Sequence, residues 1–379
     1  MVTKAKAMAG LDEVVAATSA ICFLDGERGV LAYAGYDIHD LANDSTFEEV
    51  CALLWQRRLP SRHELGDLTS QLASARALPE GVLRLMRSLP PLSGMDALRT
   101  LTSALAHYDP DATDTSLAAT RRKAVRLTSQ VGSLVATYGR MLAGGGPIAP
   151  DPALGHAANF LYMLTGDRPA AVAARALDVA LVLHADHELN ASTFAARVAA
   201  ATLTDLHSAI VAAIGTLKGP LHGGANADVM RLLLEIGDDA TPARVEDTIL
   251  GKLARKEKIP GFGHRVYRTE DPRATHLRTM SKALGERSGN QRWYEISTQI
   301  EALVMRERHL YANVDLYSAS TYHALGIPLE LFTPIFAASR MAGWTAHTLE
   351  QLEHNRLIRP RTEYVGPDVP QRYRSLADR

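Results

Sequence analysis

Residues 219–226 read Gly-Pro-Leu-His-Gly-Gly-Ala-Asn, and this stretch interrupts the chain between two blocks of helical periodicity. It places His222 among glycines and a proline, where no regular element buries the imidazole. Glycine permits close backbone approach to a ligand and positive φ angles, at a cost in local stability. We therefore expect His222 to be exposed and to face a ligand from a preformed loop.

The periodicity on both sides of this stretch is helical. In residues 296–311, Ile296, Ile300 and Val304 recur at helical spacing, with polar residues on the opposite face. Thr241-Pro242 has the pattern of an N-cap followed by a first-turn proline. The sequence predicts an all-α protein.

Strand patterns are confined to the N-terminal part of the chain. The apolar segments 21–24 and 29–33 flank a turn at 25–28 and predict one short hairpin. Gly237 carries the signal for the end of a helix. A long loop is predicted at 144–152, which contains three consecutive glycines and three prolines.

Composition narrows the classes of partner. The 379 residues contain 41 Lys and Arg against 42 Asp and Glu, so the net charge of -1 creates no field that attracts nucleic acid or an anionic membrane. The N-terminus lacks an apolar signal region, and no apolar run approaches the thickness of a bilayer. Cys22 and Cys51 form no CxxC pair, which is typical of a reducing compartment. We expect a cytoplasmic protein that binds neither nucleic acid nor membranes.

Two turn clusters predict the domain organisation. Residues 218–220 and 326–328 are rich in glycine and proline and bracket about a hundred residues. Because sites commonly lie between domains, an inserted subdomain predicts a cleft beside His222.

A second histidine and an acid lie inside this bracketed segment. His264 follows Gly261-Phe262-Gly263, and Asp315 follows Asn313-Val314 among apolar residues. Most histidines in a helical protein are packed or solvated, and a lone aspartate often caps a helix or pairs with an arginine. Two imidazoles and one carboxylate nevertheless suit carbon-acid chemistry, in which a base removes a proton beside a carbonyl and a neutral donor stabilises the enolate oxygen.

Three arginines follow in turn-like or late helical positions. Arg273 stands in Asp271-Pro272-Arg273, Arg340 in residues 339–344, and Arg359 directly before Pro360. Most arginines form surface ion pairs, but a guanidinium also binds a carboxylate bidentately. Together with the histidines they indicate a small polycarboxylate substrate.

The segment His184-Ala185-Asp186-His187-Glu188 offers a metal-binding alternative. His184 and His187 are three residues apart, which would place them on one helix face with Glu188 next to them. No third ligand is identifiable, and the spacing matches no HExxH pair. We favour hydrogen bonding to an anionic substrate and expect no metal. The glycines at 144–146 and 261–263 likewise match neither a phosphate loop nor a dinucleotide fingerprint.

Several ordered motifs together closely resemble the citrate synthase family. They are residues 159–164, 184–194, 219–226, 261–267, 271–274, 313–315 and 339–344. The match extends across nearly the entire chain. The resemblance implies an almost wholly α-helical homodimer, in which a large domain of residues 1–223 and 327–379 carries a smaller inserted domain, 224–326, that closes over the substrates.

The resemblance also implies roles for the site residues in the condensation of acetyl-CoA with oxaloacetate. Asp315 would take a proton from the acetyl methyl group, while His222 hydrogen-bonds the thioester oxygen and His264 polarises the ketone. The oxaloacetate carboxylates would be held by His187, Arg273 and Arg340, with an arginine like Arg359 reaching the site of the partner subunit. Hydrolysis of citryl-CoA would release citrate and CoA, as in the tricarboxylic acid cycle, without a metal or cofactor.

Coenzyme A recognition is assigned by the same resemblance. Pro260, Gly261, Phe262 and Gly263 are similar to the family's backbone segment beside the adenine, and Arg268 stands where a basic residue can meet phosphate. The sequence departs from the family pattern at Ala34, where many relatives have arginine, and before Met95, where a His-Pro pair is common. These departures affect local packing or CoA contacts in the N-terminal half.

Three alternatives remain open. The 2-methylcitrate synthases share these motifs and use propionyl-CoA, and one methylene changes binding by only about 1–3 kcal/mol. A metal-dependent helical hydrolase would use His184, His187 and Glu188. A noncatalytic helical scaffold is disfavoured because the chain has no helical repeat.

Overall fold

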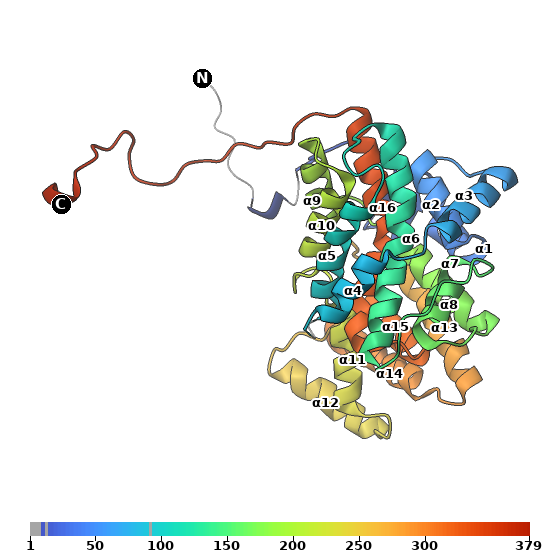
Figure 1. Ribbon diagram of the computed structural model, residues 1–379. Helices are drawn as coiled ribbons and strands as arrows, with labels where there is room; N and C mark the ends of the chain where they lie inside the picture. Colours follow the sequence, from blue (N-terminus) through green and yellow to red (C-terminus); the bar gives the residue numbers. More distant parts are fainter. Residues whose placement is uncertain (1–8, 12–13, 91–92) are drawn as a thin grey trace.

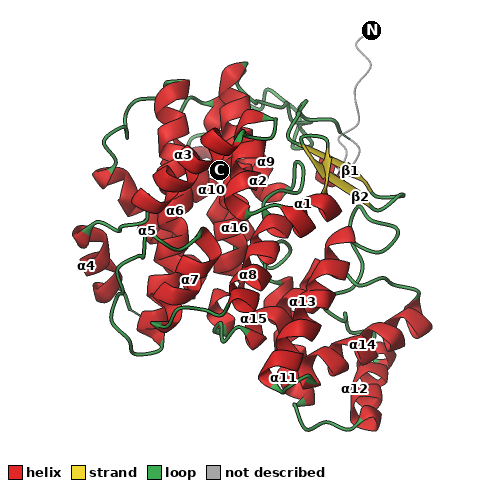
Figure 2. Ribbon diagram, turned by 90° about the vertical axis from the view of Figure 1, so that its right-hand side faces the viewer, coloured by secondary structure: helices red, strands yellow, loops and turns green. Residues whose placement is uncertain are grey.

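The computed structural model describes residues 9–11, 14–90 and 93–379, and most of them are helical (Figures 1 and 2). The α-helices of this part of the chain are α1 (Ile38–Asp44), α2 (Phe47–Gln56), α3 (Arg62–Ser74), α4 (Glu80–Ser88), α5 (Gly94–Leu105), α6 (Leu117–Leu142), α7 (His156–Thr165), α8 (Ala171–His184), α9 (Ala191–Ala201), α10 (Leu206–Leu217), α11 (Ala225–Ile236), α12 (Pro242–Ala254), α13 (Pro272–Ser288), α14 (Arg292–Arg308), α15 (Val314–Ala324) and α16 (Phe332–Glu353). The predicted all-α class is confirmed.

A small antiparallel sheet lies at the edge of the helical body (Figure 2). Strands β1 (Cys22–Asp25) and β2 (Val30–Tyr33) form the predicted hairpin, with Cys22 opposite Tyr33. A third strand, β3 (Tyr36–Asp37), pairs with β2. Tyr33 is fully buried and fastens the sheet to the body, because its hydroxyl donates to the carbonyl of Asp186 at 2.9 Å.

Two predicted helix boundaries, a start at Thr241-Pro242 and an end at Gly237, are confirmed. The side chain of Thr241 accepts the N–H of Arg244, with Pro242 in the first turn of α12. Gly237 ends α11 with a φ of 92°, a conformation that other residues rarely adopt. The predicted amphipathic segment 296–311 is helical as far as Arg308, where α14 ends, so the expectation for its last three residues is wrong.

The core is centred on α16, whose side chains are buried along most of its length. This helix packs against α6, α9, α10, α2 and α8. Figure 1 shows α16 running beside α6 through the middle of the molecule. Residues on α16 therefore have fixed positions relative to several other helices.

Helices α11 to α15 gather in the lower part of the molecule as drawn in Figures 1 and 2. Helix α11 packs against α15, α12 against α14, and α13 against both α15 and α8. Helix α11 starts at Ala225, directly after the glycine-rich stretch. The proposed division into domains at residues 224 and 326 stays a prediction.

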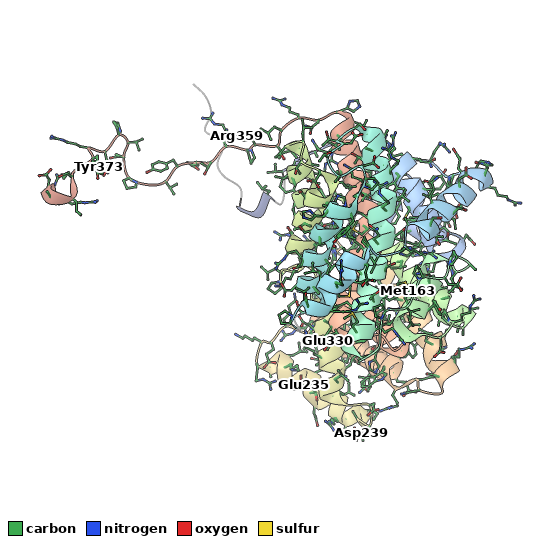
Figure 3. All side chains as sticks on the ribbon, in the orientation of Figure 1. Met163, Glu235, Asp239, Glu330, Arg359 and Tyr373 are labelled. Carbon is green, nitrogen blue, oxygen red and sulfur yellow. The ribbon has the colours of Figure 1, made fainter. Side chains whose placement is uncertain are left out.

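The segment after Glu353 leaves the helical body as an extended arm (Figure 1). Figure 3 shows Arg359 and Tyr373 on this arm, well away from the body. Within the described parts of the chain, no helix has both the length and the apolar composition needed to cross a membrane.

Candidate active site

His222 lies in the short connection between α10 and α11. Gly223 is required there by close packing, since a Cβ at this position would lie 2.3 Å from the carbonyl oxygen of Leu217. Gly219, Gly223 and Gly224 do not use the left-handed backbone region. The expected close approach is therefore present, but it is an approach to the protein's own helix α10. The ring is half-buried, so the expectation of an exposed histidine is wrong.

The His222 ring is fixed by Ser192, at the start of α9. The backbone N–H of Ser192 donates to His222 Nε2 at 3.3 Å, and the Ser192 hydroxyl oxygen lies 2.8 Å from the same nitrogen. A backbone N–H can only donate, so Nε2 is an acceptor and the neutral ring carries its proton on Nδ1. Burial, together with the charge of Arg340, lowers the pKa of His222 to about 4. His222 is therefore a neutral donor at physiological pH.

His264 follows two glycines that have positive φ angles, 86° at Gly261 and 70° at Gly263. Its Nδ1 accepts the backbone N–H groups of Val266 at 3.0 Å and Tyr267 at 3.2 Å. The proton of the neutral ring is consequently on Nε2. The segment that carries His264 thus sets the tautomer of its own histidine.

Burial and the nearby charge of Arg273 lower the pKa of His264 to about 4. The ring also packs against two neighbours, with centroids 4.7 Å from Tyr267 and 5.2 Å from His187. His264, like His222, is therefore a neutral donor in a crowded site.

Asp315 is in the first turn of α15, where the Asn313 side chain accepts its backbone N–H. Two backbone hydrogen bonds hold this helix start beside the His264 segment, from Gly263 N–H to Tyr311 O at 3.0 Å and from Asn313 N–H to Gly261 O at 2.9 Å. Burial raises the pKa of the Asp315 carboxyl to about 6. A carboxylate of this basicity suits a general base.

Arg273, in the first turn of α13, is almost fully buried and faces an aspartate. Its Nε and Nη2 donate to the two carboxylate oxygens of Asp271 at 2.9 and 2.8 Å. One of these oxygens also accepts the backbone N–H of Val314, next to Asp315, at 3.1 Å. Asp271 thus joins the starts of α13 and α15.

His187 is not on a helix, so the expected helix face shared with His184 is wrong. Helix α8 ends at His184, and the chain then turns, with Glu188 at a φ of 53°. His187 is buried, and its Nε2 has no hydrogen-bond partner among the described residues. Burial and the charge of Arg273 hold the pKa of His187 well below its usual range.

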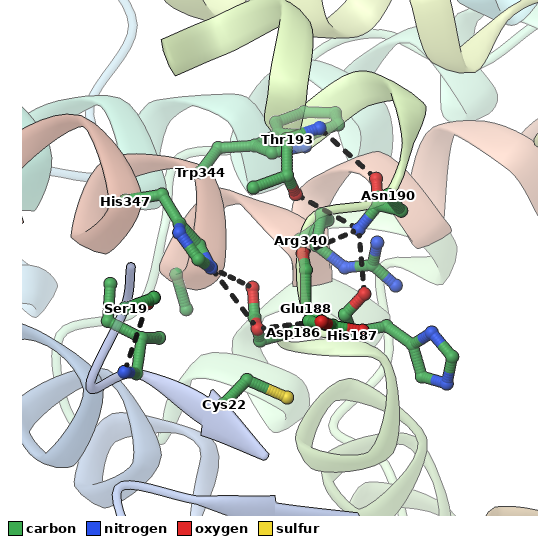
Figure 4. A network of polar contacts seen from close by, with 12 residues as sticks. Ser19, Cys22, Asp186, His187, Glu188, Asn190, Thr193, Arg340, Trp344 and His347 are labelled. Carbon is green, nitrogen blue, oxygen red and sulfur yellow. Dashed lines mark hydrogen bonds and ion pairs between the residues drawn. The ribbon is translucent and has the colours of Figure 1, made fainter. Parts of the chain in front are cut away.

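Arg340, on α16, is buried beside the same loop. Its Nε donates to the carbonyl of His184 at 2.7 Å, and its guanidinium lies 4.7 Å from the ring centre of Phe336. Figure 4 shows the His187 ring on the opposite side of the loop from His347 and Asp186. The charge of Arg340 acts on both His187 and His222, which places the three groups in one electrostatic environment.

Arg359 is the one proposed carboxylate-binding residue that this single chain does not bring to the cluster. It is exposed on the C-terminal arm, beyond the end of α16 (Figure 3). Within the described ranges, no group of three or more His, Cys, Asp or Glu side chains could hold a metal ion. His184 instead bonds the carbonyl of Ala180 through Nδ1, at 2.8 Å.

The proposed coenzyme A segment borders a pocket of about 410 Å³. Phe262 lines it, together with Leu253, Lys256, Glu257, Lys258, Ile259, Val304, Arg308 and Leu310. Arg268 is exposed elsewhere, and its backbone N–H donates to Gly26 O at 2.9 Å, next to the hairpin turn. Our sequence interpretation missed Lys256, Lys258 and Arg308; the cluster of basic residues at 255–258, shortly before Pro260, was a visible signal for the two lysines but not for Arg308.

Sequence reasoning also missed Ser192 and Asp271 as partners of the site residues. Ser192 stands in Asn190-Ala191-Ser192, a pattern typical of a helix start, and Asp271 is the N-cap of α13. Capping residues are visible in a sequence, but the distant histidine or helix that they also contact is not.

Comparison with known proteins gives concordant matches over nearly the whole chain. The family model described as "Citrate synthase, C-terminal domain" matches residues 10–361. A citrate synthase of Haloferax volcanii is 51% identical over 94% of this chain and 95% of its own length. A citrate/2-methylcitrate synthase of Bacillus subtilis is 43% identical over 94% of this chain and 96% of its own. The solved structure of a citrate synthase from Thermoplasma acidophilum, a ternary complex with carboxymethyl coenzyme A and oxaloacetate, superimposes with a TM-score of 0.90 at 32% identity and covers 98% of each chain.

Proposed function

This chain belongs to the citrate synthase family, and on that premise we propose that it condenses acetyl-CoA with oxaloacetate and water to give citrate and CoA. The observation that carries the proposal is the set of protonation states in the site. Two neutral imidazoles with pKa values of about 4 lie with a carboxyl whose pKa is about 6. Enolisation of a thioester needs this combination of one base and neutral hydrogen-bond donors.

In the first step Asp315 removes a proton from the methyl group of acetyl-CoA. The Nδ1–H of His222 donates to the thioester oxygen and stabilises the enolate that forms. Because the ring is neutral, it supplies a hydrogen bond without protonating the enolate fully.

In the second step the enolate carbon attacks the ketone of oxaloacetate. His264 donates from Nε2 to the ketone oxygen, whose negative charge grows as the carbon-carbon bond forms; the oxygen takes this proton and becomes the hydroxyl of citryl-CoA, and His264 recovers a proton from water. Its Nδ1 is already occupied by two backbone N–H groups, so Nε2 is the ring nitrogen available to donate. Water then hydrolyses citryl-CoA, and citrate and CoA leave.

The oxaloacetate carboxylates bind to His187, Arg273 and Arg340. Support comes from the burial of all three and from His187 Nε2, which has no hydrogen-bond partner in the described ranges. Arg359 completes the site of the partner subunit in a homodimer, since its own arm carries it away from the cluster. The steps use side chains of the protein alone, so the proposal includes no metal and no cofactor.

Coenzyme A lies along Pro260, Gly261, Phe262 and Gly263, with its phosphates near basic side chains. The pocket beside Phe262, with Lys256, Lys258 and Arg308, supports this placement, whereas the exposed position of Arg268 gives that residue weaker support. Residues 224–326 form the smaller domain that closes over the site. We place the enzyme in the cytoplasm, in line with its free cysteines Cys22 and Cys51.

Release of the CoA thiol tests the proposed reaction. The purified protein is mixed with oxaloacetate and acetyl-CoA, and free thiol is followed with a chromogenic disulfide. We expect thiol release that requires oxaloacetate, together with formation of citrate. Thiol release without oxaloacetate would indicate a hydrolase instead, and no release with acetyl-CoA or with propionyl-CoA would overturn the proposal.

Use of propionyl-CoA, giving 2-methylcitrate, is a second candidate activity. It is favoured by the 43% identity to the Bacillus subtilis citrate/2-methylcitrate synthase. The ratio of kcat/KM for acetyl-CoA to that for propionyl-CoA, measured at saturating oxaloacetate, decides between a single and a dual activity.

A further inference from the structure

Helix α16 fixes the loop that carries His187 on both sides of the histidine. Before it, the backbone N–H of Gly343 donates to Ala185 O at 3.0 Å. After it, the indole N–H of Trp344 donates to the hydroxyl oxygen of Ser192 at 3.1 Å. Because α16 is itself buried along most of its length, His187 has a fixed position on the helical body.

Tyr267 meets the His187 ring from the segment that follows His264. The centroids of the Tyr267 and His187 rings are 5.6 Å apart, with an angle of 70° between the planes. The Tyr267 ring also lies 4.7 Å from the ring of His264, and its backbone N–H donates to His264 Nδ1 at 3.2 Å. Val266 and Arg268 on either side of it are exposed, whereas Tyr267 is 4% exposed. Of these three successive residues, Tyr267 is therefore the one that turns inward, against both site imidazoles.

The Tyr267 hydroxyl is buried and has no hydrogen-bond partner within the described ranges. A buried tyrosine hydroxyl normally finds a partner, because folding removes the hydrogen bonds that it makes with water. Phenylalanine would fill the same space without this loss. On the ring that Tyr267 contacts, His187 Nε2 likewise lacks a partner among these residues. Two such polar atoms on adjoining rings indicate a ligand that supplies the missing partners.

The charges around the Tyr267 hydroxyl indicate that this ligand is an anion. The charge of Arg273 acts on Tyr267, His187 and His264 alike. Asp271 binds Nε and Nη2 of Arg273, so Nη1 lies outside that bidentate contact. Burial holds the pKa of the Tyr267 hydroxyl above its usual range, so the hydroxyl stays protonated and can donate. A carboxylate suits this pair, since one oxygen can bind a guanidinium while the other accepts an O–H.

We propose that Tyr267 is a further oxaloacetate-binding residue, whose hydroxyl donates to the substrate carboxylate that Arg273 holds. This role rests on the proposed function, which supplies the identity of the substrate. Tyr267 belongs to the smaller domain proposed above and His187 to the larger one, so opening of the smaller domain would part the two rings and admit the substrate. The backbone of Tyr267 orients His264 while its side chain binds the carboxylate, so one residue aligns the ketone donor with the substrate.

Tyr267→Phe is the test, because it removes the hydroxyl and keeps the ring against both imidazoles. Binding of oxaloacetate alone is measured by isothermal titration calorimetry, without any acyl-CoA. Loss of one hydrogen bond to a carboxylate predicts a Kd that is higher by about 10- to 100-fold. In turnover at saturating acetyl-CoA, the KM for oxaloacetate should rise by a similar factor while kcat stays close to wild type.

Tyr322→Phe is the matched control, since the Tyr322 hydroxyl is also buried and has no partner in the described part of the chain. Its ring packs on Phe332, with centroids 5.4 Å apart. Both substitutions remove a hydroxyl whose burial is costly, so neither should lower the melting temperature of the ligand-free protein. We expect weaker binding of oxaloacetate in Tyr267→Phe alone. Equal weakening in both variants would overturn the assignment to Tyr267.

Three results for Tyr267→Phe would also overturn the assignment. An unchanged Kd would exclude the contact, and a loss confined to kcat would place the hydroxyl at the reacting ketone instead of a carboxylate. A lower melting temperature without ligand would show that the hydroxyl serves the fold. Each of these results leaves the proposed reaction intact if the wild type binds oxaloacetate and releases thiol. Failure of the wild type to bind oxaloacetate would refute the proposed function itself.

Discussion

His222 and His264 are both glycine-flanked, half-buried imidazoles with pKa values near 4, yet their tautomers are set in different ways. His264 uses backbone N–H groups two and three residues further along its own chain segment. His222 depends on the backbone N–H of Ser192, which lies thirty residues earlier in the chain. A locally fixed histidine tolerates change in the surrounding core, while a histidine fixed from a distance is sensitive to it.

The glycines around the two histidines differ in the same sense. Gly261 and Gly263 provide backbone angles that shape the segment itself. Gly223 provides space for helix α10, which belongs to another element. Glycine therefore has a conformational purpose at one histidine and a packing purpose at the other.

The largest effect is expected when the base is removed, because both histidines then have no enolate on which to act. Asp315→Asn removes the base, so kcat should fall by about a thousandfold, within the usual range for a positioned general base. Thermal unfolding should stay close to wild type, since Asn also tolerates the first turn of a helix. The exposed Asp247→Asn on α12 is the control. Wild-type turnover in Asp315→Asn would contradict the assignment of the base.

Arg340→Ala distinguishes the two histidines electrostatically. The Arg340 charge helps to lower the pKa of His222, whereas Arg273 does so for His264. We expect kcat/KM for oxaloacetate to fall by about a hundredfold, since a buried charged contact to a carboxylate is lost. The pKa of His222 should rise and that of His264 should not, as measured by NMR titration, with exposed Arg231→Ala as control. Equal pKa shifts in the two histidines would contradict the view that different arginines act on them.

The pH dependence of turnover tests whether both histidines stay neutral while Asp315 loses its charge. Asp315 must be ionised to accept a proton, so kcat/KM for acetyl-CoA should decrease as the pH falls through about 6, by about tenfold per pH unit. Both imidazoles remain neutral until about pH 4, so a single group should account for the acid limb above that value. A second ionisation between these values would show that one imidazole becomes charged earlier than its surroundings imply.

The smallest effects concern the glycines themselves. Gly223→Ala places a Cβ against a backbone carbonyl and should lower the free energy of unfolding by about 2–3 kcal/mol through forced displacement of α10. Gly263→Ala meets only Leu310 at 3.9 Å, so it should cost about 1–2 kcal/mol from its positive φ. Urea unfolding measures both. A larger loss of unfolding free energy in Gly263→Ala than in Gly223→Ala would mean that the backbone angle constrains these glycines more than the space for a side chain does.

The sequence was most informative where the structural cause is local. The helix end at Gly237, the Thr241-Pro242 pair and the hairpin all act over a few residues, and each was predicted correctly. Periodicity also predicted the helices, because a helix buries one face at a regular spacing. The candidate histidines could be found because glycine next to an imidazole is visible without a structure.

The remaining features depend on contacts between distant segments. Trp344 and Ser192 are 152 residues apart, and no spacing rule connects them. His187 was placed on a helix because its spacing from His184 allows it, but α8 ends at His184 and Glu188 turns the chain. Arg268 was assigned by position along the chain, whereas the pocket is lined by other basic residues.

Gly343, which lets α16 approach the His187 loop, limits how this protein could be stabilised by engineering. Glycine within a helix costs about 1 kcal/mol relative to alanine, so Gly→Ala replacement in helices is a standard route to higher melting temperature. At position 343 the added Cβ would meet the Asp186 carboxylate at 2.2 Å and the Ala185 carbonyl at 2.5 Å. A thermostabilised variant should therefore keep this glycine and take its gains from helix positions outside the line of Arg340, Trp344 and His347.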